Sequence, residues 1–398
     1  MNTQNEKMTN YRWVICSMLF FATTVNYMDR QVLSLTWKDF IAPEFHWTNA
    51  DYGNITATFS IIYALAMLFA GKFVDWMDTK KGYLWSIGVW SFGACLHALC
   101  GIGTEWVVGL DSAEALRIAE GADLVAKIAS ISVTFFIIAR FVLAVGEAGN
   151  FPAAIKATAE FFPKKDRAFA TSIFNAGATV GALAAPVSIP FIAASFGWEL
   201  AFLIIGALGF VWMGFWVFIY KKPEAHPRVN ASELTYIRQD NDHEPAGTTE
   251  APAKKMPFMQ CFTYKQTWAF AFGKFMTDGV WWFFLFWTPA YLSSVYGLDS
   301  TQSAPQIFVL YLITLLSIVG GWLPTYFVEK KGMHPYAGRM RSMLIFAFFP
   351  LLALLAQPLG GMTEEFGALA VWFPVVIIGI AGAAHQAWSA NIFSTVGD

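Results

Sequence analysis

Long apolar runs constrain the fold of this chain more than any other feature of its sequence. A membrane-spanning helix needs about 20 mostly apolar residues, and the 398-residue sequence holds ten runs of that kind. They lie at about residues 11–33, 52–75, 82–103, 132–154, 167–194, 198–221, 266–295, 303–329, 340–358 and 366–392. The runs are continuous and do not alternate, so helices are the structure that satisfies the backbone in lipid. We therefore predict an all-α, polytopic membrane protein.

The composition agrees with a lipid environment. Hydrophobic residues make up 56% of the chain and charged residues 14%, which does not suit a soluble globule. A formal net charge of -2 offers no basic surface for nucleic acid. The four cysteines, Cys16, Cys95, Cys100 and Cys261, show no metal-ligand spacing, so we predict buried free thiols, with neither a metal site nor a cofactor.

The positions of the positive charges predict the orientation. With the N-terminus in the cytoplasm, eighteen Lys and Arg residues lie on the cytoplasmic side, and Lys38, Arg117 and Lys127 lie on the opposite side. Cytoplasmic loops are enriched in Lys and Arg. We expect a multi-pass protein of the cell inner membrane with a cytoplasmic N-terminus.

Two polar segments divide the chain. Residues 222–264 form the longest polar stretch and predict a cytoplasmic linker between a six-helix bundle, residues 1–221, and a second bundle, residues 265–398. Residues 104–131 predict an outer-side insertion with a short amphipathic helix that serves as a lid or a packing element. Six spans, a linker and more spans are typical of transporters built from two six-helix halves. The second bundle would then end after its fourth helix, so ten of twelve expected spans are present.

A few charged residues lie inside the predicted spans, where an uncompensated charge costs several kcal/mol and tends to mark ion and substrate pathways. Asp29 and Arg30 belong to the first run, and Arg140 and Glu147 to the fourth. Seven residues are about two helical turns, so Arg140 and Glu147 share a face about 10 Å apart. A guanidinium clamps a carboxylate with two hydrogen bonds, while a buried carboxyl near it exchanges a proton as its surroundings change. The pattern predicts a proton-coupled anion site; the alternative is a set of structural ion pairs.

Two further pairs have mainly structural interpretations. Lys274 and Asp278, four residues apart, predict an intrahelical ion pair, with a second proton site as the lesser alternative. Gly177 and Gly181 predict a close approach between helices.

Several motifs resemble known transporters. Gly71 to Asp75, followed by Asp78-Thr79-Lys80-Lys81, resembles the loop between the second and third helices of the major facilitator superfamily, which implies a gating role for Gly71 and Asp75. Four further blocks resemble the hexuronate transporters of its anion:cation symporter family. They are Asn26 to Arg30, Gly146 to Lys156 with its continuation to Gly177, Lys274 to Phe283, and His385 to Asn391.

This resemblance implies a two-bundle fold and a monomeric proton symporter that imports galacturonate, glucuronate or a related sugar acid by alternating access. It assigns proton coupling to Asp29 and Glu147, and contact with the substrate carboxylate to Arg30 and Arg140. Further substrate contacts would come from Tyr27, Tyr63, Asn175, Trp282, His385, Gln386, Trp388, Ser389 and Asn391. Tyr63 and Trp282 have packing or interfacial roles as alternatives, and His385 could bond a backbone carbonyl.

Two other function classes compete with this interpretation. One is a carrier of another organic anion, such as an aldonate or aldarate, by proton or sodium coupling or by facilitated exchange. The other is a membrane-embedded receptor or enzyme. The sequence contains no Ser/His/Asp set, phosphate-binding glycine loop or metal cluster, so we do not expect an enzyme.

Overall fold

The computed structural model describes residues 7–239 and 258–397, and helices make up its regular structure. The chain forms two compact units, Met1–Thr248 and Thr249–Asp398, called here the N-terminal and C-terminal units. Of the predicted linker, residues 240–257 lie outside the described residues, as does residue 398 of the predicted second bundle.

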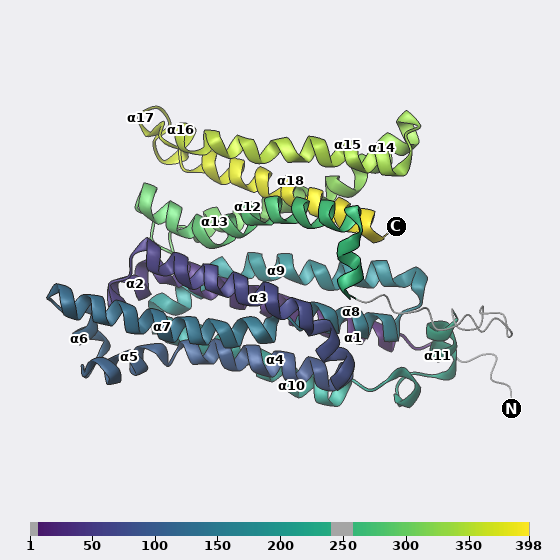
Figure 1. The fold of residues 1–398 in the computed structure, drawn as a ribbon, viewed down its shortest axis with the longest axis horizontal. Coiled ribbons are helices and arrows are strands. Elements are labelled where there is room, and N and C mark those ends of the chain that lie inside the picture. Colours follow the sequence, from purple (N-terminus) through teal and green to yellow (C-terminus); the bar gives the residue numbers. More distant parts are fainter. Residues whose placement is uncertain (1–6, 240–257, 398) are drawn as a thin grey trace. The chain divides into compact units, whose positions relative to one another are not determined.

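The N-terminal unit contains six long helices and several short ones (Figure 1). Its helices are α1 (Tyr11–Thr36), a π-helical turn (Trp37–Ile41), α2 (Ala42–Phe45), α3 (Asn49–Met77), α4 (Thr79–His97), α5 (Cys100–Val108), α6 (Ala113–Arg117), α7 (Ala122–Glu147), α8 (Asn150–Phe161), α9 (Lys164–Phe196), α10 (Trp198–Ile219), a 3-10 turn (Pro223–Ala225) and α11 (Ala231–Arg238).

Close helix packing in this unit depends on small residues. α1 packs along α9, and α4 packs against both α7 and α10. A Cβ atom on Gly177 would collide with the carbonyl oxygen of Phe20, and one on Gly181 with that of Thr24. The close approach predicted from these two glycines is confirmed, and it brings the polar part of α1 against α9.

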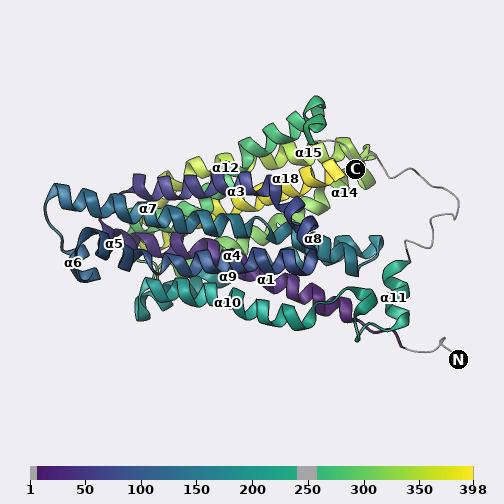
Figure 2. The same ribbon diagram turned by 60° about the horizontal axis from the view of Figure 1, so that its bottom comes forward.

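The predicted insertion lies at one end of the N-terminal unit, and α11 lies at the other (Figure 2). Residues 104–131 form the end of α5, the five-residue α6 and the first turns of α7. Leu116 of α6 and Ile128 of α7 are fully buried, and a ring nitrogen of His46 lies 2.9 Å from the carbonyl oxygen of Leu116. These contacts give the insertion a packing role over α2.

The first part of the predicted linker is docked on the N-terminal unit. Glu233 of α11 is fully buried and accepts hydrogen bonds from the backbone N–H groups of Tyr11 and Arg12, at 3.0 and 3.1 Å. The Arg12 guanidinium also donates to it at 3.0 Å. A carboxylate placed at the first turn of α1 satisfies donors that have no partner within the helix.

The C-terminal unit is arranged around its last helix. Its helices are a 3-10 turn (Phe258–Thr263), α12 (Lys265–Tyr296), α13 (Ala304–Thr314), a 3-10 turn (Leu315–Ile318), α14 (Val319–Lys331), α15 (Pro335–Phe348), a 3-10 turn (Phe349–Leu355), α16 (Ala356–Gly360), α17 (Thr363–Phe366), a 3-10 turn (Gly367–Leu369) and α18 (Trp372–Gly397). α18 packs against α12, α13, α14 and α15. Polar residues on α18 therefore meet several neighbours.

Seven helical segments of the described residues are long and apolar enough to cross a membrane. They are Asn49–Met77, Ala122–Phe161, Phe169–Phe196, Trp198–Ile219, Ala304–Lys331, Tyr336–Gly360 and Trp372–Ile392. Helices α4 and α5, bent by 48° at their junction, would make an eighth. The two other predicted spans fall on α1 and α12, which are long enough but contain more polar residues, so the predicted count of ten is not confirmed.

Candidate functional site

An ion pair between α1 and α7 lies at the centre of the N-terminal unit's polar residues. Nε of Arg30 lies 2.6 Å from Oε2 of Glu147, and the side chains of these residues are 2% and 0% exposed. The two residues are 117 positions apart in the sequence. Glu147 shares a helix face with Arg140 by its spacing, but its direct ionic contact in the structure is with Arg30 of the first helix.

Asp29 and Arg140 are buried beside this pair, and most of their polar side-chain atoms have no hydrogen-bonded partner among the described residues. Neither carboxylate oxygen of Asp29 makes a hydrogen bond within the described residues, and the same holds for Nε and one terminal nitrogen of Arg140. Asp29 lies within electrostatic range of Glu147, Arg140 and Arg30. The Arg140 guanidinium lies 5.2 Å from the centre of the Phe59 ring. Buried charges without partners are costly, so a ligand, water or a proton would stabilise this group.

The predicted aromatic contacts gather around Arg30. Its guanidinium carbon lies 4.4 Å from the ring centre of Tyr63 on α3 and 5.3 Å from that of Tyr27 on α1. Cation–π contacts of this kind hold a guanidinium in place. Asn175 is exposed on α9, so the structure does not bring it into the buried group.

Two buried polar residues near this group, Asn26 and His97, are absent from the predicted site. Asn26 is fully buried on α1, one turn before Arg30, and both polar atoms of its amide lack a partner among the described residues. His97 is fully buried on α4, stacks on Phe202 with ring centres 4.7 Å apart, and places Nδ1 2.7 Å from the Gly93 carbonyl oxygen. Asn26 belongs to a polar motif, but His97 lies in an apolar run that gives no signal.

The predicted gating residues lie inside a helix, which corrects their placement in a loop. Gly71 and Asp75 belong to the last turns of α3, which ends at Met77, and the turn itself is made at Asp78 with φ of 68°. Asp75 pairs with Lys156 of α8 at 3.0 Å, and Lys156 also donates to the carbonyl oxygen of Val74. These contacts tie the end of α3 to α8.

A second charged cluster lies in the C-terminal unit, between α12 and α18. The Lys274 ammonium lies 2.6 Å from Oδ1 of Asp278 and donates to Oγ of Ser389 at 2.9 Å. Nε2 of His385 lies 3.4 Å from the same Oδ1. The predicted Lys274–Asp278 pair is confirmed, and the structure adds His385 and Ser389 to it.

The remaining predicted residues of this unit have mixed surroundings. Asn391 donates its amide nitrogen to the carbonyl oxygens of Gly320 and Ala387. Trp388 packs against the apolar cluster that includes Phe346. Trp281, the neighbour of the predicted substrate residue Trp282, stacks on His385, with ring centres 5.9 Å apart. Gln386 is half-buried and Trp282 stacks on Phe286.

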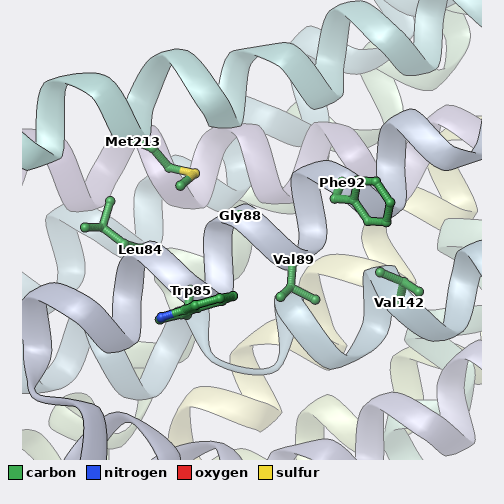
Figure 3. A pocket seen from close by; sticks show the side chains of 7 residues that line it. All are labelled: Leu84, Trp85, Gly88, Val89, Phe92, Val142 and Met213. Atoms are coloured by element: carbon green, nitrogen blue, oxygen red, sulfur yellow. The ribbon is translucent and has the colours of Figure 1, made fainter.

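Two apolar hollows lie on the N-terminal unit. One, of about 420 Å³, is lined by side chains of α4, α7 and α10 such as Trp85, Phe92, Val142 and Met213 (Figure 3). The other, of about 630 Å³, lies between α3, α4 and α7. Their linings are apolar or hydroxyl-bearing and carry no charged side chain, so they do not suit an acid. Among the described residues, no group of three or more His, Cys, Asp or Glu is arranged to hold a metal.

The apolar helices are those of a multi-pass membrane protein, and the family that the chain matches makes it a transporter and not an enzyme. The chain matches the Major Facilitator Superfamily over residues 19–397 and belongs to that family. It is similar to the hexuronate transporter of Escherichia coli (strain K12), with 26% identity over 98% of this chain and 81% of the relative. It is also similar to the galacturonate transporter of Dickeya chrysanthemi, with 27% identity over 92% of this chain and 95% of the relative.

The chain is also similar to a third relative and to two solved structures. The probable galactarate/D-glucarate transporter GarP of Escherichia coli (strain K12) is 27% identical over 99% of this chain and 87% of its own length. The structure of a bacterial homologue of the human lysosomal transporter Spinster aligns with a TM-score of 0.62 at 19% identity, covering 97% of this chain and 76% of that one. A D-xylose-proton symporter aligns with a TM-score of 0.54 at 16% identity, covering 97% and 89%. These two structures support the fold alone.

Proposed function

We propose that this protein is a secondary active transporter that imports a sugar acid, such as galacturonate or glucuronate, together with protons by alternating access. The observation that carries the proposal is the buried group of Asp29, Arg30, Arg140 and Glu147, which holds two acids and two guanidinium groups inside the N-terminal unit. The names of the hexuronate and galacturonate transporters to which the chain is similar support the substrate class.

The buried group suggests how binding of the sugar acid is linked to binding of a proton. Glu147 occupies Arg30 through a 2.6 Å contact, so a substrate carboxylate competes with Glu147 for that guanidinium. Protonation of Glu147 weakens its hold on Arg30 and leaves a cation for the incoming anion. Asp29, which has no hydrogen-bonded partner among the described residues, is the second proton acceptor. Arg140 supplies the second guanidinium.

The proposal includes a topology. α1, the bent α4–α5 pair and α12 add to the seven apolar segments to give ten spans, since each is helical over the predicted window. The chain would then carry six spans, a cytoplasmic linker at 222–264 and four spans of a second bundle, in the cell inner membrane, with a cytoplasmic N-terminus and as a monomer. The polar residues of α1 and α12 would line the transport path, which explains their lower hydropathy. Gly71 and Asp75 would take part in gating, and the predicted substrate residues of both units would contact the sugar.

The test is Glu147→Gln in proteoliposomes. Glutamine cannot carry a proton in and out, so uphill accumulation of galacturonate under a proton gradient should disappear while counterflow exchange persists. Tyr83→Phe is a control of similar burial outside the charged group. Accumulation and exchange both at wild-type levels in the variant would remove Glu147 from proton coupling.

A second candidate is a carrier of aldarates or another organic anion. The similarity to the probable galactarate/D-glucarate transporter favours it. Uptake of galacturonate, gluconate and glucarate, measured at two pH values with and without a proton uncoupler, separates the two. Uptake that prefers glucarate or ignores the uncoupler favours this candidate.

A further inference from the structure

The charge cluster between α12 and α18 has features of a ligand site that a packing pair lacks. Asp278 receives both Lys274, at 2.6 Å, and His385, at 3.4 Å, on the same oxygen, Oδ1. Its second oxygen, Oδ2, has no hydrogen bond or ion pair among the described residues. The carboxylate is therefore held from one side, and its other side is open to accept hydrogen bonds.

The exposure of its side chains indicates which side of the cluster is open. The Asp278 side chain is 37% exposed, whereas those of Lys274 and His385 are 17% and 5% exposed. A carboxylate in a spanning helix does not face lipid, so this side of α12 meets water or a ligand. Neither ring nitrogen of the buried His385 makes a hydrogen bond among the described residues, so the approach of Nε2 to Asp278 is an ionic contact alone.

The charge of the cluster restricts the ligand. The Lys274 ammonium and the Asp278 carboxylate lie 2.6 Å apart and compensate one another, so the cluster attracts neither a free anion nor a metal cation strongly. Neutral O–H donors remain, and a carboxylate binds them with charge-assisted hydrogen bonds.

We propose that Asp278 binds hydroxyl groups of the sugar, with Lys274 and His385 as positioning residues that orient its carboxylate. The inference rests on the proposed transport of sugar acids and adds the part of the substrate that the C-terminal unit recognises. Hydroxyl recognition within the C-terminal unit is assigned to Asp278.

The test pairs Asp278→Ala with monodeoxy analogues of galacturonate and glucuronate, using uptake in proteoliposomes of the full chain. Loss of a charge-assisted hydrogen bond should raise KM for the parent sugar acid about tenfold or more. For the wild-type protein, KM should be higher by a similar factor for the analogue that lacks the contacted hydroxyl than for the parent sugar acid. For D278A, KM should be the same for that analogue as for the parent sugar acid, because the contact is already absent. K274Q should raise KM less, since it loosens the carboxylate without removing it.

Controls separate this inference from its alternatives. Thr277→Ala, on the same helix, removes a hydroxyl that bonds the carbonyl oxygen of Gly273 at 2.9 Å, and should leave KM unchanged. D278A could be poorly folded because its Lys274 ammonium has lost the carboxylate. The double variant K274M/D278A removes both charges and should show the same loss of discrimination between the parent sugar acid and the deoxy analogue. An equal loss on every analogue, or none, overturns the role of Asp278. Failure of the wild-type protein to move any sugar acid overturns the proposed function itself.

Discussion

The two charged groups of this protein differ in how far they are withdrawn from solvent. In the N-terminal unit, Arg30 and Glu147 are at most 2% exposed and pair between helices α1 and α7. In the C-terminal unit, Lys274 and Asp278 are 17% and 37% exposed and pair within α12. A buried pair that loses one member leaves a charge with no solvent to stabilise it. In a partly exposed pair, water stabilises the charge that remains. The two groups should therefore respond very differently to the same type of substitution.

The largest effect is expected for Arg30→Met. The change leaves Glu147 buried without its cation, which should lower the free energy of unfolding by about 3–5 kcal/mol and abolish uptake. The measurement is thermal unfolding of the detergent-purified protein, together with galacturonate uptake in proteoliposomes.

The matched control is the double variant R30M/E147M, which removes both charges. It should recover most of the lost stability but none of the uptake, because packing is restored and the anion site is not. A melting temperature of R30M equal to that of the wild type would mean that water reaches the pair, and the contrast between the units would be lost.

A buried carboxyl with a different partner sharpens the comparison. Glu44 of α2, in the connection between α1 and α3, is 2% exposed and accepts from Nε1 of Trp198 at 2.9 Å, so its partner is neutral. Burial is the main cause that raises the pKa of Glu44 from 4.5 to about 7. The folded protein then binds this proton more tightly than the unfolded chain, so stability falls as the pH rises from about 4.5 through 7.

Glu44→Gln should remove this pH dependence, since the amide oxygen still accepts from Trp198. At pH 8 the variant should have a higher melting temperature than the wild type, with a free energy of unfolding larger by no more than roughly 3 kcal/mol, and near pH 5 the two should match. E114Q, an exposed change on α6, serves as the control. A wild-type melting temperature that rises from pH 5 to pH 8 as much as that of E44Q would contradict this assignment.

The smallest effect on stability is expected for Lys274→Met. A partly exposed pair within one helix contributes less than about 1 kcal/mol, so the melting temperature should change little while KM for the sugar acid rises. A loss of stability as large as that of R30M would show that the C-terminal pair is as buried in the membrane as the N-terminal one.

The sequence alone determined the helical class and the residues that carry charge into the apolar segments. Continuous apolar runs leave the backbone no other solution in lipid, and charges within them have to be compensated. Local spacing was equally decisive, since Lys274 and Asp278 meet as their four-residue separation requires. The glycines of α9 allowed the close contact with α1 for the same local reason.

The tertiary structure decided the partners of residues that are far apart in the chain. The pairing of Glu147 with Arg30, the meeting of His385 with Asp278, and the capping of α1 by Glu233 all depend on how one helix is rotated against another. A periodic pattern defines the faces of a helix but not which neighbour each face meets. The choice is made by side-chain packing summed over whole helices, and no single motif contains that sum.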